Sequence, residues 1–190
     1  CWVAMVDLYL RPSELVCMTQ AQVIGPQPGR GMERVAFLLN PGYLGKYSKT
    51  GELDESLHVQ RPWIGKLLWS YVRRRPLKNM LWDYDLATLR TAFLIACHQV
   101  GIAHLCPVLY MARHSGASLD RLENNLSLAE VQQRGRWRSD TSVRRYEKRA
   151  MVQETASLVS NAVKRKALRQ EAALIPLLGK TLASRRSLAW

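Results

Sequence analysis

The chain has 190 residues, of which 47% are hydrophobic, and it carries a formal net charge of +13. This length and apolar content exclude a wholly disordered protein and allow a sizeable core in one domain, with or without an appendage. The positive charge favours a polyanionic partner over a membrane surface or an acidic protein.

The cysteines and the apolar runs exclude further classes of protein. Cys1, Cys17, Cys97 and Cys106 form no CxxC pair and have no histidine at zinc-binding spacing, so we expect no metal site. Cys97 and Cys106 stand in apolar surroundings, where we expect reduced core thiols and therefore a reducing compartment. No apolar run reaches membrane-spanning length and no signal peptide is visible, so neither a membrane location nor secretion is expected. Because the chain begins with Cys, we expect it to be part of a longer protein that lacks its N-terminal portion here.

The first twenty residues predict two helices with an arginine between them. Residues 1–9 are apolar enough for a buried helix, and Pro12 and Glu14 suit the first turn of a second helix. Arg11 lies at the junction among apolar neighbours, where a cation needs an anion. That anion is either the carboxylate of Glu14 or a phosphate of a ligand.

Residues 21–60 predict a small antiparallel sheet. Short strands are expected at 22–24, 34–40 and 56–59, separated by turns rich in Gly and Pro. The second turn carries Lys46 and Lys49.

Helical periodicity resumes at Arg61. One apolar face runs from Trp63 to Val72, and a second runs from Leu86 to Val100 and stops at Gly101. A third helix-like run covers 108–119 and holds Arg113, again an arginine that needs an anion. His114 beside it is interpreted as a partly buried packing or hydrogen-bonding histidine.

A cationic segment then covers residues 134–149, with seven Lys or Arg against two acids. It follows a short helix over 127–134, which Ser127 and Glu130 cap and Gly135 ends. Ser139 and Asp140 are natural N-cap residues, so another helix is expected to begin there. Tyr146 would lie one to two turns into that helix. Nearby cations can stabilise the anion of such a phenol and bring it close to a phosphate.

The remaining residues, 151–190, are predicted to form a basic helical tail. An amphipathic helix is expected over 151–172, and a further turn is expected to end at Pro176–Gly179. The whole is therefore an α+β protein, mainly helical, with its small sheet between the first helices and the remaining helices. Residues 1–150 form the main domain and 151–190 the tail.

Four motifs in this order resemble the catalytic domain of tyrosine recombinases, the phage integrases and Cre-like enzymes. They are LRPSEL at 10–15, KTG at 49–51, YMARHSGAS at 110–118, and GRW followed nine residues after its Trp by Tyr146. The resemblance covers about residues 2–150. It implies the same fold, without a cofactor, and a separate N-terminal DNA-binding domain.

The resemblance also implies a role for each matching residue. Arg11 and Arg113 correspond to the pair that holds the scissile phosphate, which planar guanidinium groups suit, and Glu14 steadies Arg11. Lys49, with Lys46 as the second choice, corresponds to the lysine that protonates the departing 5′ oxygen. Trp137 donates its indole N–H to the phosphate, and Tyr146 is the nucleophile. The cationic surface that we expect to meet DNA comprises Arg134, Arg136, Arg138, Arg144 and Arg145.

Tyr110 departs from the family pattern, which usually has His three residues before the second arginine. A tyrosine donates a hydrogen bond but accepts a proton poorly at neutral pH. Three explanations stay open: the base is dispensable, His114 takes part of its role, or the enzyme is slow or inactive.

The function implied is DNA strand cleavage and rejoining through a 3′-phosphotyrosyl link, as in site-specific recombination or integration by a mobile element. Double-stranded DNA and a homo-oligomer joined through the C-terminal helix are the expected partners, in the nucleus or cytoplasm. The alternatives are a type IB topoisomerase-like enzyme and a DNA-binding relative that has lost catalysis. The fragment alone is expected to bind DNA weakly.

Overall fold

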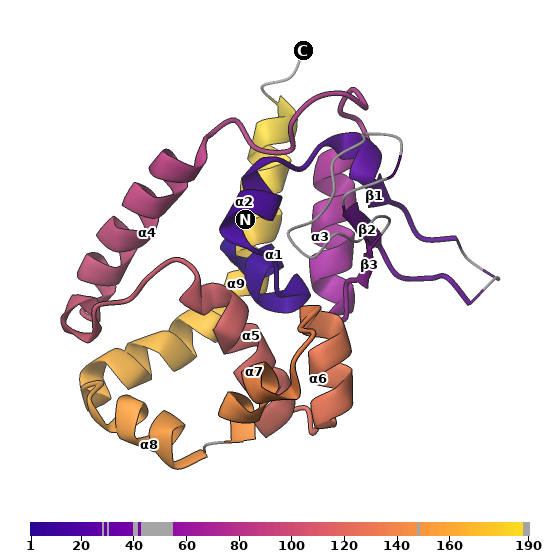
Figure 1. The fold of residues 1–190 in the computed structure, drawn as a ribbon. Coiled ribbons are helices and arrows are strands. Elements are labelled where there is room, and N and C mark those ends of the chain that lie inside the picture. The colour runs from indigo at the N-terminus through magenta and orange to yellow at the C-terminus, as the bar shows by residue number, and fades with distance from the viewer. Residues whose placement is uncertain (28, 30, 40–41, 43–54, 148, 188–190) are drawn as a thin grey trace.

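The computed structural model describes residues 1–27, 29, 31–39, 42, 55–147 and 149–187. This part of the chain is mainly helical, with one three-stranded antiparallel sheet that follows the first two helices and precedes the others (Figure 1). The predicted α+β class is confirmed at this level. No helix in these ranges is long and apolar enough to cross a membrane.

The N-terminal helices are α1 (Trp2–Leu8) and α2 (Pro12–Val16), as predicted. Tyr9 ends α1 in the left-handed conformation, with φ 48°, and turns the chain toward α2. Both helices bury their apolar side chains in the main core, where Met5, Leu10 and Leu15 are fully buried.

The sheet consists of β1 (Val23–Ile24), β2 (Ala36–Leu39) and β3 (Glu55–His58), preceded by the short 3₁₀ turn η1 (Gln20–Gln22). Its three strands lie where the sequence predicted strands. Phe37 of β2 pairs with Val23 on one side and with Leu57 on the other, and all three are buried. Directly opposed residues of neighbouring strands share a face, so this row forms the apolar side of the sheet.

Two longer helices follow, α3 (Pro62–Val72) and α4 (Leu86–Val100). The Asp85 carboxylate caps α4 by accepting from the backbone N–H of Thr88 at 2.8 Å, and Gly101 ends it with φ 82°, as predicted. The predicted face of α4 is the one that packs, whereas Leu94 and Ile95 on the other side are about half exposed.

Helix α5 (Met111–Leu122) follows a short 3₁₀ turn, η3 (Ala103–Leu105), and packs closely against α1. The contact depends on Gly116, because a side chain there would collide with the carbonyl oxygen of Val6 and the ring of Tyr9.

The next segment comprises α6 (Leu128–Gly135), α7 (Asp140–Arg144) and the 3₁₀ turn η4 (Arg145–Glu147). The predicted capping box of α6 and the N-cap Ser139 of α7 are both present. Helix α6 ends at Gly135, as predicted, and Arg136 follows it in the left-handed conformation. One prediction was wrong. Tyr146 lies in η4, because α7 ends two residues before it.

The tail differs more from its prediction. The helix expected over 151–172 is two helices, α8 (Arg149–Ser157) and α9 (Asn161–Ser187), with a break in which Thr155 and Ala156 accept backbone bonds from Leu158 and Val159. Pro176 lies inside α9 and does not end it. The tail touches its own chain, because α9 packs on α3 and the Leu158 carbonyl is 3.1 Å from Nε2 of His104.

The buried residues form two clusters. The larger joins α1 and α2 to the sheet, α3 and α4, and the smaller consists of Tyr9, Ala117, Val131, Val143 and Tyr146. Cys97 is buried as expected, but Cys106 is exposed, because it follows the short turn η3 at the surface. The smaller cluster positions the candidate site.

Candidate active site

Arg11 and Glu14 bind each other at the junction between α1 and α2. Glu14 Oε1 accepts from Arg11 Nη1 at 2.6 Å, and Glu14 Oε2 accepts from the backbone N–H of Arg11 at 2.7 Å. The carboxylate thus satisfies both the cation and an unpaired N–H at the start of α2. The Glu14 carboxylate, one of the two anions that the sequence left open, thus binds Arg11. The side chain of Arg11 is 18% exposed, so it also reaches the surface.

Arg113, in the first turn of α5, is completely buried. Its Nη1 donates to the carbonyl oxygen of Tyr9, and its Nη2 donates to the carbonyl oxygen of Gly135. Glu14 Oε2 lies 4.0 Å from Nη1. Burial, and then the charge of Arg136, lowers the pKa of Arg113 to about 10, so the group is still cationic at neutral pH.

Glu14 is also bound by Arg136. Arg136 Nη2 donates to Glu14 Oε2 at 2.8 Å, and Nη1 contacts Glu55 of β3 at 3.3 Å. Burial raises the pKa of Glu14, but Arg136 and Arg11 together outweigh that effect and hold the pKa below its usual value. One carboxylate therefore joins three arginines from α2, α5 and the end of α6.

Tyr146 is buried beside Trp137, with 3% of its surface exposed. The two ring centroids are 5.2 Å apart, and the Trp137 ring lies 4.9 Å from the guanidinium carbon of Arg113. Burial raises the pKa of Tyr146 to about 12, although Arg145 and Arg113 act in the opposite direction. The cations thus act in the predicted direction, toward the phenolate, but desolvation is the larger effect and the phenol stays protonated at neutral pH.

His114 contacts the hydroxyl of Tyr146. Its Nδ1 lies 2.5 Å from Tyr146 Oη, within hydrogen-bond distance. The imidazole stacks on Trp137, with centroids 6.4 Å apart and planes 7° from parallel. Tyr110, the N-cap residue of α5, is 38% exposed, and its ring meets the imidazole in a T-shaped arrangement with centroids 5.0 Å apart. The predicted packing histidine is therefore paired with the predicted nucleophile.

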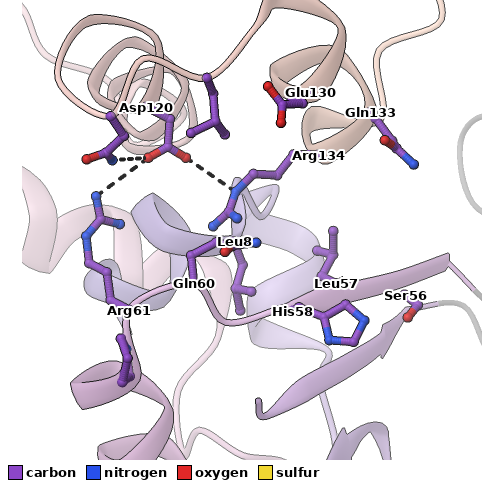
Figure 2. Close-up of a pocket in the computed structure, with 13 residues that line it drawn as sticks. Leu8, Ser56, Leu57, His58, Gln60, Arg61, Asp120, Glu130, Gln133 and Arg134 are labelled. Carbon is purple, nitrogen blue, oxygen red and sulfur yellow. Dashed lines mark hydrogen bonds and ion pairs between the residues drawn. The ribbon is translucent and has the colours of Figure 1, made fainter. Parts of the chain in front are cut away.

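Behind these residues lies a network of two aspartates and two arginines that the sequence reasoning missed. Asp7 is fully buried and accepts from Arg61 Nη1 at 2.7 Å. Asp120 accepts from Tyr9 Oη and from Asn124 Nδ2, each at 2.6 Å, and it forms ion pairs with Arg61 and Arg134 (Figure 2). A cavity of about 630 Å³ borders the network. A charged residue inside the apolar stretch 1–9 was the available signal, since a buried carboxylate requires cationic partners.

The predicted DNA-contacting arginines fall into two groups. Arg134 and Arg136 have side chains less than one-tenth exposed and bind carboxylates within the protein. The others are exposed, namely Arg138, Arg144 and Arg145. Arg144 and Arg145 border an apolar groove of about 1060 Å³ between α5 and α8, which His114 and Tyr146 also line.

Lys46 and Lys49 lie outside the described residues. Within the described ranges, no three His, Cys, Asp or Glu side chains are grouped as a metal ion would need. The site as described is thus a set of arginines, aromatic rings and one histidine, assembled from α2, α5, the end of α6 and η4. Such a set can hold an anion and can transfer a proton to or from a phenol.

Comparisons with known proteins give no relative: no family model, no curated protein and no solved structure matches the chain.

Proposed function

We propose that the protein cleaves and rejoins DNA strands in the manner of a tyrosine recombinase, with Tyr146 as the nucleophile. The observation that carries the proposal is a continuous set of contacts among residues far apart in the sequence. Arg11 binds Glu14, Glu14 lies 4.0 Å from Arg113, Arg113 lies under the Trp137 ring, and that ring packs on Tyr146. These are the residues whose motifs resemble the family.

The chemistry needs charge neutralised on the phosphate oxygens and a nucleophile in line with the leaving group. Arg11 and Arg113 supply the charge, and the Tyr146 oxygen attacks the phosphorus while the bond to the 5′ oxygen breaks. The phosphotyrosyl link keeps the energy of the broken bond, so a 5′-hydroxyl of DNA can reseal the strand without ATP. The proposal includes Lys49 as the proton donor to the leaving oxygen.

Burial of the two central groups sets a condition on this reaction. Arg113 has no exposed surface and Tyr146 has 3%. DNA binding must therefore move Trp137 off the guanidinium of Arg113. Arg113 must also exchange its two carbonyl acceptors, on Tyr9 and Gly135, for phosphate oxygens. The same burial favours a second candidate function, a DNA-binding relative without catalysis, in which Arg113 serves the core alone.

Covalent capture separates the two functions. The protein is incubated with nicked or supercoiled DNA, quenched in detergent and examined for a protein–DNA adduct. We expect an adduct that Tyr146→Phe abolishes. Tyr84→Phe removes a hydroxyl from the aromatic cluster of Tyr71, Trp82 and Tyr84, which is not part of the site, and is expected to retain the adduct. Arg11→Ala is expected to slow its formation by about 10²–10³-fold, as loss of one donor to a developing oxyanion does.

Two other outcomes identify the alternatives. Salt-sensitive DNA binding without an adduct on any substrate indicates the inactive relative. An adduct accompanied by relaxation of supercoiled DNA by a monomer indicates the topoisomerase-like enzyme. For recombination, the proposal includes an oligomer joined through α9, whose exposed Leu168, Ile175 and Leu177 offer apolar surface to a neighbour. Light scattering on DNA-bound protein measures that assembly.

A further inference from the structure

The proposed reaction needs a group that takes the proton of Tyr146, and the sequence position expected to supply it holds Tyr110. Residues four apart on a helix share a face, so the next position on the same side of α5 is His114. Its Nδ1 lies 2.5 Å from Tyr146 Oη, close enough for a proton to pass directly between the two atoms. Tyr110 itself packs against the imidazole in a T-shaped arrangement, with ring centroids 5.0 Å apart.

The surroundings hold the imidazole in place on three sides. Trp137 stacks on one face, Tyr110 abuts it from the preceding turn, and Tyr146 binds Nδ1. Of these three contacts, those with Tyr110 and Tyr146 can keep the ring oriented for proton transfer when DNA binding moves Trp137.

Burial and the cations around His114 favour its neutral form, which is the form that accepts a proton. Burial, followed by the cations Arg145 and Arg113, lowers the pKa of His114 below its ordinary value. The other titratable groups that face it or line the same groove are Tyr110 and Tyr146, with Arg144 and Glu123 at the groove wall.

We propose that His114 is the general base of the cleavage step, one helical turn from the position where the resemblance places it. The inference rests on the proposed function. In cleavage, the proton of Tyr146 passes to Nδ1 while the bond from Oη to phosphorus forms. The bond from phosphorus to the 5′ oxygen breaks, and that oxygen leaves with the electron pair and is protonated by the general acid. In rejoining, a 5′-hydroxyl gives its proton to the deprotonated general acid and attacks phosphorus. The bond from phosphorus to Oη then breaks, and the imidazolium returns its proton to Tyr146.

The first test is the pH dependence of adduct formation by DNA-saturated protein. For the wild type, we expect the rate to rise with pH until His114 is neutral and then to level off. His114→Gln is expected to lower the rate at pH 7 by about 10²–10³-fold, within the range of general-base catalysis. In this variant the rate is also expected to keep rising with pH and to reach no plateau, since the phenol of Tyr146 must then ionise without a base. His98→Gln, on the exposed side of α4, is the matched control and keeps both rate and profile.

Two further arms exclude a purely structural role for His114. Added imidazole is expected to restore adduct formation by His114→Gly. Arg145→Ala removes a cation beside the ring, so the protonated form of His114 becomes less unfavourable and its pKa rises. The inflection in the pH–rate profile is therefore expected to move to higher pH.

A titration of free protein by NMR tests the hydrogen bond without any reaction. If Nδ1 accepts from Tyr146, the bond favours the neutral ring, so Tyr146→Phe raises the pKa of His114. A lowered pKa means that the ring donates instead and overturns the inference.

An unchanged pH profile in His114→Gln, with the adduct still lost in Tyr146→Phe, overturns the inference while the proposed function stands. An inflection lost in Tyr110→Phe instead assigns the base to Tyr110. No adduct from the wild type removes the proposed function and the inference together.

Discussion

At the scale of single residues, Glu14 has the most consequential position, because one carboxylate serves three guanidinium groups. Arg11 and Arg136 bind it directly, and Arg113 lies at 4.0 Å. The side chain of Glu14 is only 11% exposed. Removing its negative charge therefore leaves these cations close together, with little water to separate them. Glu14→Gln is therefore expected to cost about 3 kcal/mol of unfolding free energy at pH 7, as loss of one partner of a buried ion pair does.

The pH dependence of that loss follows from the direction of the pKa shift. The pKa of Glu14 is lower in the folded protein than its ordinary value, so the charge stabilises the fold fully above the ordinary pKa. The stabilisation is lost as pH falls through the lowered folded pKa. Urea unfolding at pH 7 and at successively lower pH should show the wild type converging on Glu14→Gln. Glu33→Gln, at an exposed loop position, is the control. A difference that stays constant over this range would contradict the assignment.

At the scale of elements, the closest helix contact is between α1 and α5 at Gly116. A methyl group there meets the carbonyl oxygen of Val6, which is backbone and cannot rotate away. Gly116→Ala is expected to destabilise the protein by about 1–3 kcal/mol, the usual range for overpacking, despite the better helix propensity of Ala. Because α5 carries Arg113 and His114, the same change should also lower activity.

Gly65 in α3 is the matched control for that substitution. A methyl group at Gly65 meets Val35 at 3.6 Å and Val59 at 3.7 Å, which are ordinary contacts. Gly65→Ala is therefore expected to leave stability unchanged or to raise it by up to about 1 kcal/mol. Thermal unfolding of the two variants measures the contrast. Equal effects would mean that α1 and α5 can separate at little cost.

At this scale, the sequence predicted the features that depend on residues close together in the chain. The capping box of Ser127 and Glu130, the stop at Gly101 and the pairing of Arg11 with Glu14 all depend on residues within a few positions. The network of Asp7 with Arg61 and Arg134 could not be predicted, because its members lie more than fifty residues apart.

The candidate site divides in the same way. The motifs identified Arg113, Trp137 and Tyr146 as members of one site, and the structure places them in contact. They did not predict that Arg113 would be covered or that Tyr146 would be desolvated, since burial depends on how α5, α6 and η4 pack. The break between α8 and α9 has no signal as strong as Pro or Gly, and Pro176 lies within a helix where the sequence indicated an end.

At the scale of the whole molecule, the net charge of +13 predicts affinity for DNA, but the structure divides the arginines unequally. Arg134 and Arg136 bind carboxylates inside the protein, whereas Arg144 and Arg145 are exposed beside the groove that reaches Tyr146. If DNA binds at the candidate site, the exposed pair should carry phosphate contacts. Replacing both by Ala is expected to weaken binding and to reduce the slope of log K against log salt by about 2, close to one unit per lost contact.

The control removes the same charge from another place. Arg73 and Arg74 are exposed after the end of α3, at the opposite end of the molecule from α7 (Figure 1). A double substitution there lowers the net charge equally, so it should weaken binding slightly through the overall field and leave the slope nearly unchanged. Fluorescence anisotropy with a duplex at several salt concentrations gives both quantities. If the two double variants lose the same affinity and the same slope, DNA is held by diffuse charge. The groove beside Tyr146 would then not be its binding site.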